Sequence, residues 1–256
     1  MSRSTSSILW LHGIPGSGKS MLVVHVIEYL QARAQGDGGV AYFYCARTAN
    51  EPERADPAEL LRCLLEQMAC LDESEPIQLP IVAVYHSRKN EARGRKPEKL
   101  GMEECVEVVI ELLRLNTVTI VVDGLDECDP TRRQELLDAF QKIVTESDNI
   151  VKIFVSSRDD HDLIHRLSRT PNLYIKAADN KSDIERFVTS RVEEAISKER
   201  ILCGKVPREL KNIIVETLTR KAEGMFRLIS LHIQSLCDPV RSKHRRMYST
   251  HSNISR

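Results

Sequence analysis

The sequence lacks the features that mark a secreted or membrane-spanning protein. No apolar run approaches the roughly 20 residues that a helix needs to cross a bilayer. The first seven residues, MSRSTSS, are polar and lack the apolar core of a signal peptide. Net charge is lacking too, because 37 Lys and Arg balance 37 Asp and Glu. We therefore expect a cytoplasmic protein with no membrane span and no nucleic-acid partner.

Paired cysteines are also missing. The chain has seven cysteines, an odd number, and no C-x-x-C pair, which disfavours a zinc site. The expectation is reduced, mostly buried thiols in an intracellular protein. His161 and His165 have the spacing of metal ligands on a helix, but no third ligand accompanies them, so we interpret them as a surface pair. Trp10, the only tryptophan, is expected in the core.

Short apolar runs alternate with helical patterns along most of the chain. Five runs have the length and residue types of buried strands, at 8–12, 40–44, 117–122, 151–155 and 172–176. The sequence therefore predicts an open, mostly parallel α/β sheet with helices on both faces. After about residue 178 the pattern becomes helical throughout, which predicts a small helical annex.

Several helix boundaries carry their own signals. The segment 20–30 is apolar almost all round, as expected for a helix buried against a sheet. Asp56 is expected to cap a helix, Ser182 and Glu185 to form a capping box, and Gly224 to end a helix.

Two segments are less definite. Asp129 and Pro130 are expected to open another helix. Residues 72–101 allow two readings, a helix with a basic end or a surface excursion, and their basic residues indicate exposure to solvent.

Gly13 to Ser20 reads GIPGSGKS, which matches G-x-x-x-x-G-K-[ST] between a strand and a helix. The glycines let backbone N–H groups point at phosphate oxygens, and the helix adds its partial positive charge. The alternative is a glycine-rich surface turn, which the strand-to-helix context disfavours. Lys19 should reach the β- and γ-phosphates of ATP, and Ser20 should ligate Mg²⁺. The predicted nucleotide-binding residues are Gly13, Ile14, Pro15, Gly16, Ser17, Gly18, Lys19, Ser20 and Met21.

Three carboxylates follow the strand predicted at 117–122. Asp123 ends the apolar run, where α/β sheets place groups that face a ligand, and we predict that it holds Mg²⁺. Asp126 or Glu127 would orient the attacking water. The alternative is an acidic turn in which Asp126 or Asp129 only caps a helix. For Asp129 the cap is preferred.

Arg158 follows a third strand end, three residues beyond Val155. An arginine there could contact the terminal phosphate of ATP and stabilise the charge that is transferred. The alternative is a surface arginine that pairs with Asp159 or Asp160.

Together these stretches resemble the NACHT family, and more narrowly the nephrocystin-like NACHT modules of fungal NOD-like receptors. The matching stretches are ILWLHGIPGSGKS, VAYFYC, TIVVDGLDEC, KIFVSSR and KAEGMFRLISLHIQSL, and the resemblance runs from Ile8 to Leu236. The first stretch holds the Walker A motif and the third the Walker B motif. A small residue after Asp123, with acidic residues two and three positions further on, is more specific than the P-loop alone.

The resemblance implies a P-loop NTPase sheet with strand order 5-1-4-3-2. It also implies a slow, Mg²⁺-dependent ATPase of the STAND class of signalling proteins, in which ADP holds the resting form and ATP permits oligomerisation. The implied partners are the nucleotide, a second copy of the chain, or full-length NOD-like relatives. Two alternatives stay open, a non-catalytic module that only holds nucleotide and, less favoured, a small-molecule P-loop kinase.

The resemblance also assigns the segments of the chain. We expect a disordered N-terminus (1–7), a NACHT core (8–178), the helical annex (179–237) and a disordered basic tail (238–256). No effector domain precedes Ile8 and no winged-helix pattern follows Leu236, so the chain is expected to be truncated at both ends relative to that family.

Overall fold

A computed structural model describes residues 5–33, 38–70 and 77–238. It divides the chain into two compact units. Of the described residues, those within 5–13 and 19–174 form the first unit, and those within 14–18 and 175–238 form the second. The tail predicted at 238–256 lies outside the described residues except for Asp238, as do residues 1–4 of the predicted N-terminal segment.

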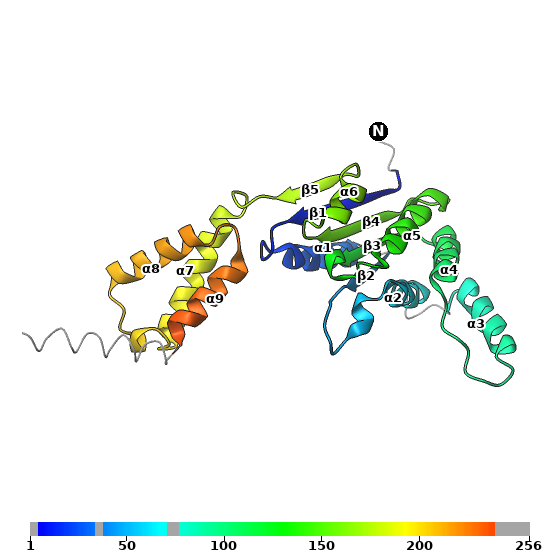
Figure 1. Cartoon of the computed structure of the whole chain (residues 1–256), viewed down its shortest axis with the longest axis horizontal. Helices are drawn as coiled ribbons and strands as arrows, with labels where there is room; N and C mark the ends of the chain where they lie inside the picture. Colours follow the sequence, from blue (N-terminus) through cyan, green and yellow to red (C-terminus); the bar gives the residue numbers. More distant parts are fainter. Residues whose placement is uncertain (1–4, 34–37, 71–76, 239–256) are drawn as a thin grey trace, which may run out of the picture. The chain divides into compact units, whose positions relative to one another are not determined.

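A five-stranded parallel sheet forms the centre of the first unit, in the order β2-β3-β4-β1-β5 (Figure 1). β4 pairs in parallel with β1 on one side and β3 on the other, and β2 pairs in parallel with β3. The strands are β1 (Ser7–Gly13), β2 (Gly39–Tyr44), β3 (Val118–Asp123), β4 (Lys152–Ser157) and β5 (Asn172–Ile175). The five predicted strands and their order are confirmed.

Side chains alternate between the two faces of the sheet, so its register decides which helices each face meets. On one face, Trp10 lies opposite Val155 and Val155 opposite Val122, and all three share a core with the leucines of α2 (Pro57–Ala69), α4 (Met102–Leu115) and α5 (Arg133–Glu146). The remaining helices of this unit are α1 (Lys19–Arg33), α3 (Leu79–Glu91) and α6 (His161–Leu167), with short 3-10 turns η1 (Pro52–Ala55) and η2 (Leu125–Glu127).

Helix α1 contacts strands β1 to β4, but only Val23 and Ile27 of α1 are buried. Met21, Leu22 and Tyr29 are exposed, although the segment is apolar almost all round. A helix touches a sheet along one stripe, so residues off that stripe stay open within this unit.

Three helix boundaries show how local side chains decide where a helix begins. Asp56 caps α2 as predicted, and its carboxylate accepts a hydrogen bond from Ala58 N at 2.8 Å. The start predicted at Asp129 and Pro130 is wrong, because α5 begins at Arg133. The Asp129 carboxylate instead accepts from Thr131 N at 2.9 Å, which holds a turn before the helix. In the segment 72–101 both readings apply in part, since α3 covers Leu79–Glu91 and an exposed loop follows it.

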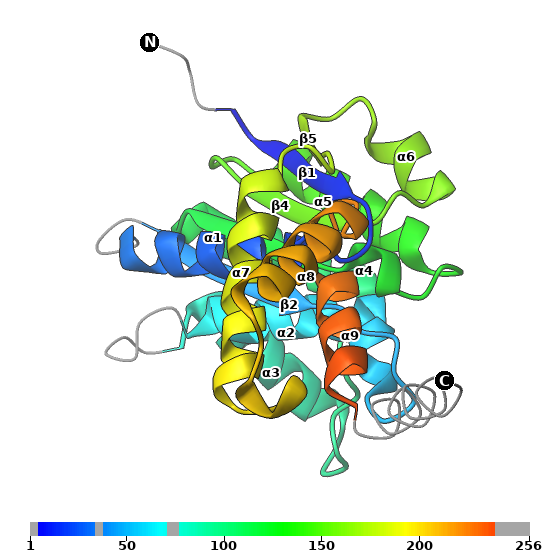
Figure 2. The same cartoon turned by 90° about the vertical axis from the view of Figure 1, so that its left-hand side faces the viewer.

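The second unit contains α7 (Lys181–Ser197), η3 (Leu202–Gly204), α8 (Arg208–Lys221) and α9 (Phe226–Cys237). The three α-helices pack against one another (Figure 2). Buried residues from all three form its core, among them Ile184, Val188, Val192, Leu218 and Ile229.

Two predicted caps in this unit are wrong. The capping box of Ser182 and Glu185 does not form, because the N-cap of α7 is Asn180, two residues before Ser182. Helix α8 ends at Lys221 rather than at Gly224. Gly224 has a φ of +83°, and an added Cβ would lie 2.6 Å from Ala177 Cα, so the glycine serves a close backbone approach.

The single tryptophan behaves as predicted, whereas the thiols do so only in part. Trp10 is 1% exposed, and its Nε1 donates to Ser157 Oγ at 2.8 Å. All seven cysteines are free, but only three are buried, and Cys70 and Cys203 are exposed, so the expectation of mostly buried thiols is wrong. Among the described residues, none of the helices has both the length and the apolar character needed to cross a membrane.

Replacing Asp56 tests the cap of α2. Asp56→Ala should lower the free energy of unfolding by about 1 kcal/mol, because Ala58 N–H loses its acceptor. Asp56→Asn keeps an acceptor oxygen and loses only a half-exposed ion pair with Arg132, so it should cost much less. Urea denaturation of both variants measures the difference. An equal loss in the two variants would assign the effect to the ion pair.

Candidate nucleotide-binding site

The strand order brings the carboxyl ends of β3, β4 and β1 together at one edge of the sheet. Asp123 ends β3 and is 7% exposed, and its Oδ1 accepts a hydrogen bond from the hydroxyl of Ser156 on β4. The same hydroxyl accepts from Gly124 N at 3.2 Å. Gly124 has a φ of +71°, and an added Cβ would meet Cys45 O at 3.2 Å, so the sharp turn after β3 requires glycine. The end of β3 is therefore held to β4 by one serine.

Asp126 and Glu127, on η2, both contact Arg158 at the end of β4. The backbone N–H of Arg158 donates to Asp126 Oδ1 at 2.9 Å, and its Nε lies 3.3 Å from Asp126 Oδ2. Its Nη2 lies 3.0 Å from Glu127 Oε1. The side chain of Asp126 is 8% exposed, whereas that of Arg158 is 52% exposed. Arg158 thus ties the two strand ends together and keeps much of its guanidinium open to solvent.

The alternative partners of Arg158 are engaged elsewhere. Asp159 contacts His12 Nδ1 at 2.7 Å, and Asp160 contacts the buried Arg133 at 3.2 Å. The alternative reading of Arg158, a surface pair with either of these aspartates, is therefore wrong, because Arg158 pairs with Asp126 and Glu127. The reason is that the turn after β4 directs these carboxylates towards β1 and α5.

Lys19, the lysine of the P-loop motif, donates from Nζ to Gly13 O at 2.8 Å. Partial burial lowers the pKa of the Lys19 ammonium, and the positive charge of Arg158 acts in the same direction. The negative charges of Asp126, Asp159 and Asp123 oppose the shift. Lys19 therefore lies in the electrostatic field of the residues at the ends of β3 and β4.

The loop residues Ile14–Gly18 pack with the second unit. Gly16 O accepts from Phe226 N at 2.8 Å, and Gly16 and Gly18 have φ angles of +73° and +95°. The Ser17 side chain is 3% exposed, and within the described part of the chain its Oγ has no hydrogen-bond partner. A loop with left-handed glycines and an unsatisfied buried hydroxyl fits an oxygen-rich ligand such as a phosphate.

The donor set also fits Mg²⁺ bound together with a nucleotide. Ser20 is exposed and Asp123 supplies a carboxylate, and both offer the oxygen ligands that Mg²⁺ prefers. Across the described ranges, no group of three or more His, Cys, Asp or Glu side chains could hold a metal by itself. Mg²⁺ commonly binds through one or two carboxylates plus phosphates of the substrate, so this set suits a metal that arrives with ATP or ADP. Met21, the last predicted contact, is 62% exposed.

Three residues of the site were missed from the sequence. Ser156 holds Asp123, Arg133 contacts the backbone of η2, and Arg47 donates from Nη2 to Asp126 O at 3.1 Å. The pair SS before Arg158 was a weak signal for Ser156. Nothing local distinguishes Arg133 from Arg132, because only the packing of α5 decides which of the two points inwards.

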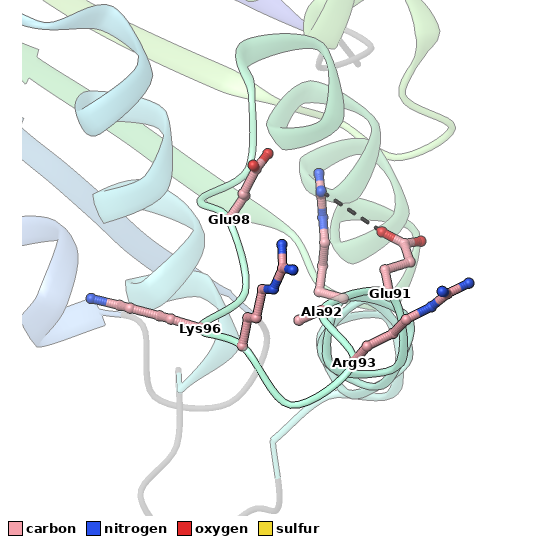
Figure 3. A pocket seen from close by; sticks show the side chains of 7 residues that line it. Glu91, Ala92, Arg93, Lys96 and Glu98 are labelled. Carbon is pink, nitrogen blue, oxygen red and sulfur yellow. Dashed lines mark ion pairs between the residues drawn. The ribbon is translucent and has the colours of Figure 1, made fainter.

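A separate cavity of about 540 Å³ lies at the end of α3 (Figure 3). It contains an ion pair of 3.9 Å between Arg88 and Glu91, and its lining residues are Arg88, Glu91, Ala92, Arg93, Arg95, Lys96 and Glu98. None of the predicted site residues lines it, so it is distinct from the site at the strand ends.

Comparison with known proteins identifies relatives of the chain. The sequence model of the family described as "Nephrocystin 3, N-terminal" matches residues 1–158, a span that includes every predicted site residue from Gly13 to Arg158. The vegetative incompatibility protein HET-E-1 of Podospora anserina is 24% identical over 248 residues. That alignment covers 93% of this chain and 17% of the relative, so the chain spans about a sixth of the length of HET-E-1.

A solved structure shows the same fold. The structure described as "Structure of Drosophila ORC bound to DNA" contains a chain with a TM-score of 0.52 and 15% identity, covering 99% of this chain and 64% of that one. At this identity the similarity concerns the fold alone. It agrees with the α/β P-loop architecture predicted from the sequence.

A double-mutant cycle tests whether Ser156 holds Asp123. Ser156→Ala should cost about 1–3 kcal/mol of unfolding free energy, because the buried Asp123 carboxylate and Gly124 N–H both lose a partner. Asp123→Asn should cost less in the Ser156→Ala background than in the wild type, with a coupling of at least about 0.5 kcal/mol. Urea denaturation of the four proteins gives the coupling.

The matched control is Ser147→Ala, since the Ser147 hydroxyl bonds Ile143 O at the end of α5. Its effect should add to that of Asp123→Asn within error. If the effects of Ser156→Ala and Asp123→Asn on the free energy of unfolding also add, Ser156 does not hold the Asp123 carboxylate.

Proposed function

The chain belongs to the Nephrocystin 3, N-terminal family, and from this premise we propose that it binds ATP and ADP with Mg²⁺, hydrolyses ATP slowly and acts as a nucleotide-dependent switch. One observation carries the proposal. The only chemical difference between the two nucleotides is the γ-phosphate, and Arg158 presents a half-exposed guanidinium beside Asp126 and Glu127, in the field that also acts on Lys19. A guanidinium in this position would recognise the negatively charged phosphates of a nucleotide rather than its neutral base or ribose.

The loop from Gly13 to Ser20 would hold the phosphates. Its left-handed glycines leave backbone N–H groups available, and the buried Ser17 hydroxyl supplies one further donor. Lys19 would contribute a positive charge to the β- and γ-phosphates. Its Nζ donates to Gly13 O at 2.8 Å, which places the ammonium beside the first residue of the motif.

Ser20 and Asp123 would hold Mg²⁺, which when bound neutralises charge on the phosphates. The Ser156 hydroxyl orients the Asp123 carboxylate from behind, so the free oxygen of this carboxylate has a defined direction. This arrangement supports a metal role for Asp123 rather than a role as a proton acceptor.

Asp126 and Glu127 would position the attacking water. In hydrolysis the water oxygen bonds to the γ-phosphorus, the bond from that phosphorus to the bridging oxygen breaks, and a carboxylate accepts the proton. The Arg158 side chain contacts both carboxylates in the structure, so its turning to the phosphate would release Asp126 Oδ2 and Glu127 Oε1 to act on water. Because Arg158 would have to leave these two oxygens before they act on water, hydrolysis would be slow and would depend on whether a γ-phosphate is bound.

The side chain of Asp126 is 8% exposed, but it keeps the hydrogen bond from Arg158 N when the guanidinium turns away, and Glu127 is partly exposed. A charge-assisted hydrogen bond to a phosphate contributes about 1.5–3 kcal/mol, which would offset the loss of the two ion pairs. ATP would therefore draw Arg158 away from Asp126 and Glu127, and ADP would leave these contacts in place. As in the family resemblance, we propose that this change controls association with a second copy or with a longer NOD-like relative.

Lys19→Ala tests nucleotide binding itself. The variant should lose measurable binding of both ADP and a slowly hydrolysed ATP analogue in calorimetric titrations, because the lysine charge on the phosphates is gone. The core should stay folded, since a half-buried loop lysine contributes little packing. Lys142→Ala, an exposed lysine on α5, is the control and should bind as the wild type does. Micromolar affinity retained in Lys19→Ala would overturn the P-loop assignment.

Arg158→Ala tests the switch. The affinity for the ATP analogue should fall about ten- to a hundredfold, as expected for the loss of one charge-assisted contact. The ADP affinity should change hardly at all, because ADP has no γ-phosphate. The same titrations measure both constants. Equal losses for the two nucleotides would assign Arg158 to the fold or the β-phosphate, and no loss for either would leave it a surface residue.

A further inference from the structure

Arg133, at the start of α5, has a side chain that is 97% buried. An arginine cannot lose its charge at neutral pH, so its burial is costly unless every face of the guanidinium has a partner. The partners that satisfy it belong to two different loops. This makes Arg133 a link between segments that are adjacent only in the folded chain.

One side of the guanidinium binds the segment that follows β4, which comprises the loop up to Asp160 and the first turn of α6. Its Nε and Nη2 form a bidentate pair with Asp162, at 2.9 and 2.8 Å, and its Nη1 lies 3.2 Å from Asp160 Oδ2. Asp160 precedes α6, where an aspartate commonly caps the helix, yet its side chain makes no cap. The carboxylates of Asp160 and Asp162 are therefore committed to Arg133, whereas Asp159 contacts His12.

The other side binds the backbone of η2, which carries Asp126 and Glu127. Arg133 Nη1 donates to Asp126 O at 3.0 Å and approaches Leu125 O at 3.5 Å. The guanidinium is flat and rigid, so it fixes the carbonyls of η2 and the carboxylates after β4 at set positions relative to each other.

Asp126 and Arg158 are the residues that this geometry aligns. Asp126 carries the carbonyl that Arg133 holds, and Arg158 lies two residues before Asp160. The two meet directly, through Arg158 N and Asp126 Oδ1 at 2.9 Å. Resting on the proposed function, we propose that Arg133 is a positioning residue, which holds η2 and the loop after β4 in register so that Arg158 can distinguish ATP from ADP.

The adjacent Arg132 offers a matched control. It lies on the same turn and pairs with Asp56 at 2.7 Å and Glu135 at 3.5 Å, with its side chain 37% exposed. Arg132 therefore has the same charge as Arg133 and is next to it in sequence, but its ion pairs are with Asp56 and Glu135 rather than with Asp160 and Asp162.

The test compares Arg133→Lys with Arg132→Lys. Lysine keeps the charge but cannot hold four groups in one plane. In nucleotide-free Arg133→Lys, amide hydrogen exchange at Arg158 should be at least about tenfold faster than in the wild type. The Arg158 N–H is protected by its bond to Asp126, and that bond should open locally when Arg133 no longer holds the two segments in place. Exchange in the central strands should be unchanged. Arg132→Lys should leave both rates as in the wild type.

The second readout is discrimination between nucleotides. In Arg133→Lys the preference for the ATP analogue over ADP should fall at least about fivefold, while the ADP affinity stays within about twofold of the wild type. Turnover should show a higher KM for ATP, because KM approaches the dissociation constant when chemistry is slow, together with a lower kcat. If Arg133 only stabilised the fold, the variant would not change the preference for the ATP analogue, and amide exchange would not accelerate at Arg158 more than elsewhere.

Asp162→Asn provides a second variant in case Arg133→Lys does not fold, since it weakens the same link from the other side and should change both readouts in the same direction. Unchanged exchange at Arg158, or acceleration spread evenly over the central strands, would overturn the positioning role. If the wild type binds neither nucleotide, the proposed function fails, while the exchange measurement still decides whether Arg133 holds the two loops.

Discussion

The position of β4 between β1 and β3 is the constraint on which the candidate site depends. In a parallel sheet all strands point the same way, so three neighbouring strands must end at one edge. Here those ends carry Gly13, Asp123 and Ser157, which are far apart in sequence. The buried contact between the Ser156 hydroxyl and Asp123 then ties two of these ends together and gives the Asp123 carboxylate a direction.

Charge neutralisation organises the residues beyond the strand ends. Asp126, Glu127, Asp160 and Asp162 would repel one another if they stood alone, and arginines separate them. Arg158 satisfies the first two at the open side of the site, and the buried Arg133 satisfies the last two beneath it. The Arg158 side chain is 52% exposed, so its guanidinium stays hydrated when its ion pairs break, whereas the Arg133 side chain is 3% exposed and would be left as a buried, unpaired charge. This difference in solvent exposure suits Arg158 to a moving part and Arg133 to a fixed one.

The conformation of the predicted phosphate loop depends on contacts other than these ion pairs. Its residues Ile14–Gly18 pack with the second unit, where Asn180 donates from Nδ2 to Ser17 O at 2.9 Å and to Gly224 O at 3.2 Å. The capping box expected at Ser182 would have given α7 a start determined by its own sequence. The observed start leaves the Asn180 amide to bond the loop instead. The loop is therefore shaped by residues more than 160 positions away in sequence.

Local sequence determined the elements, and long-range packing decided the partners. Short β-branched runs gave the five strands, GIPGSGKS gave the loop and Asp56 with Pro57 gave the start of α2, because each depends on neighbouring residues only. The strand order came from the family resemblance, since periodicity says nothing about which strands pair. Only the tertiary structure decided that Arg158 meets Asp126 and Glu127 rather than Asp159 or Asp160, and that Arg133 rather than Arg132 is buried. A charged side chain pairs with whichever opposite charge the fold brings within reach, and that distance is a property of the packed sheet and helices, not of spacing along the chain.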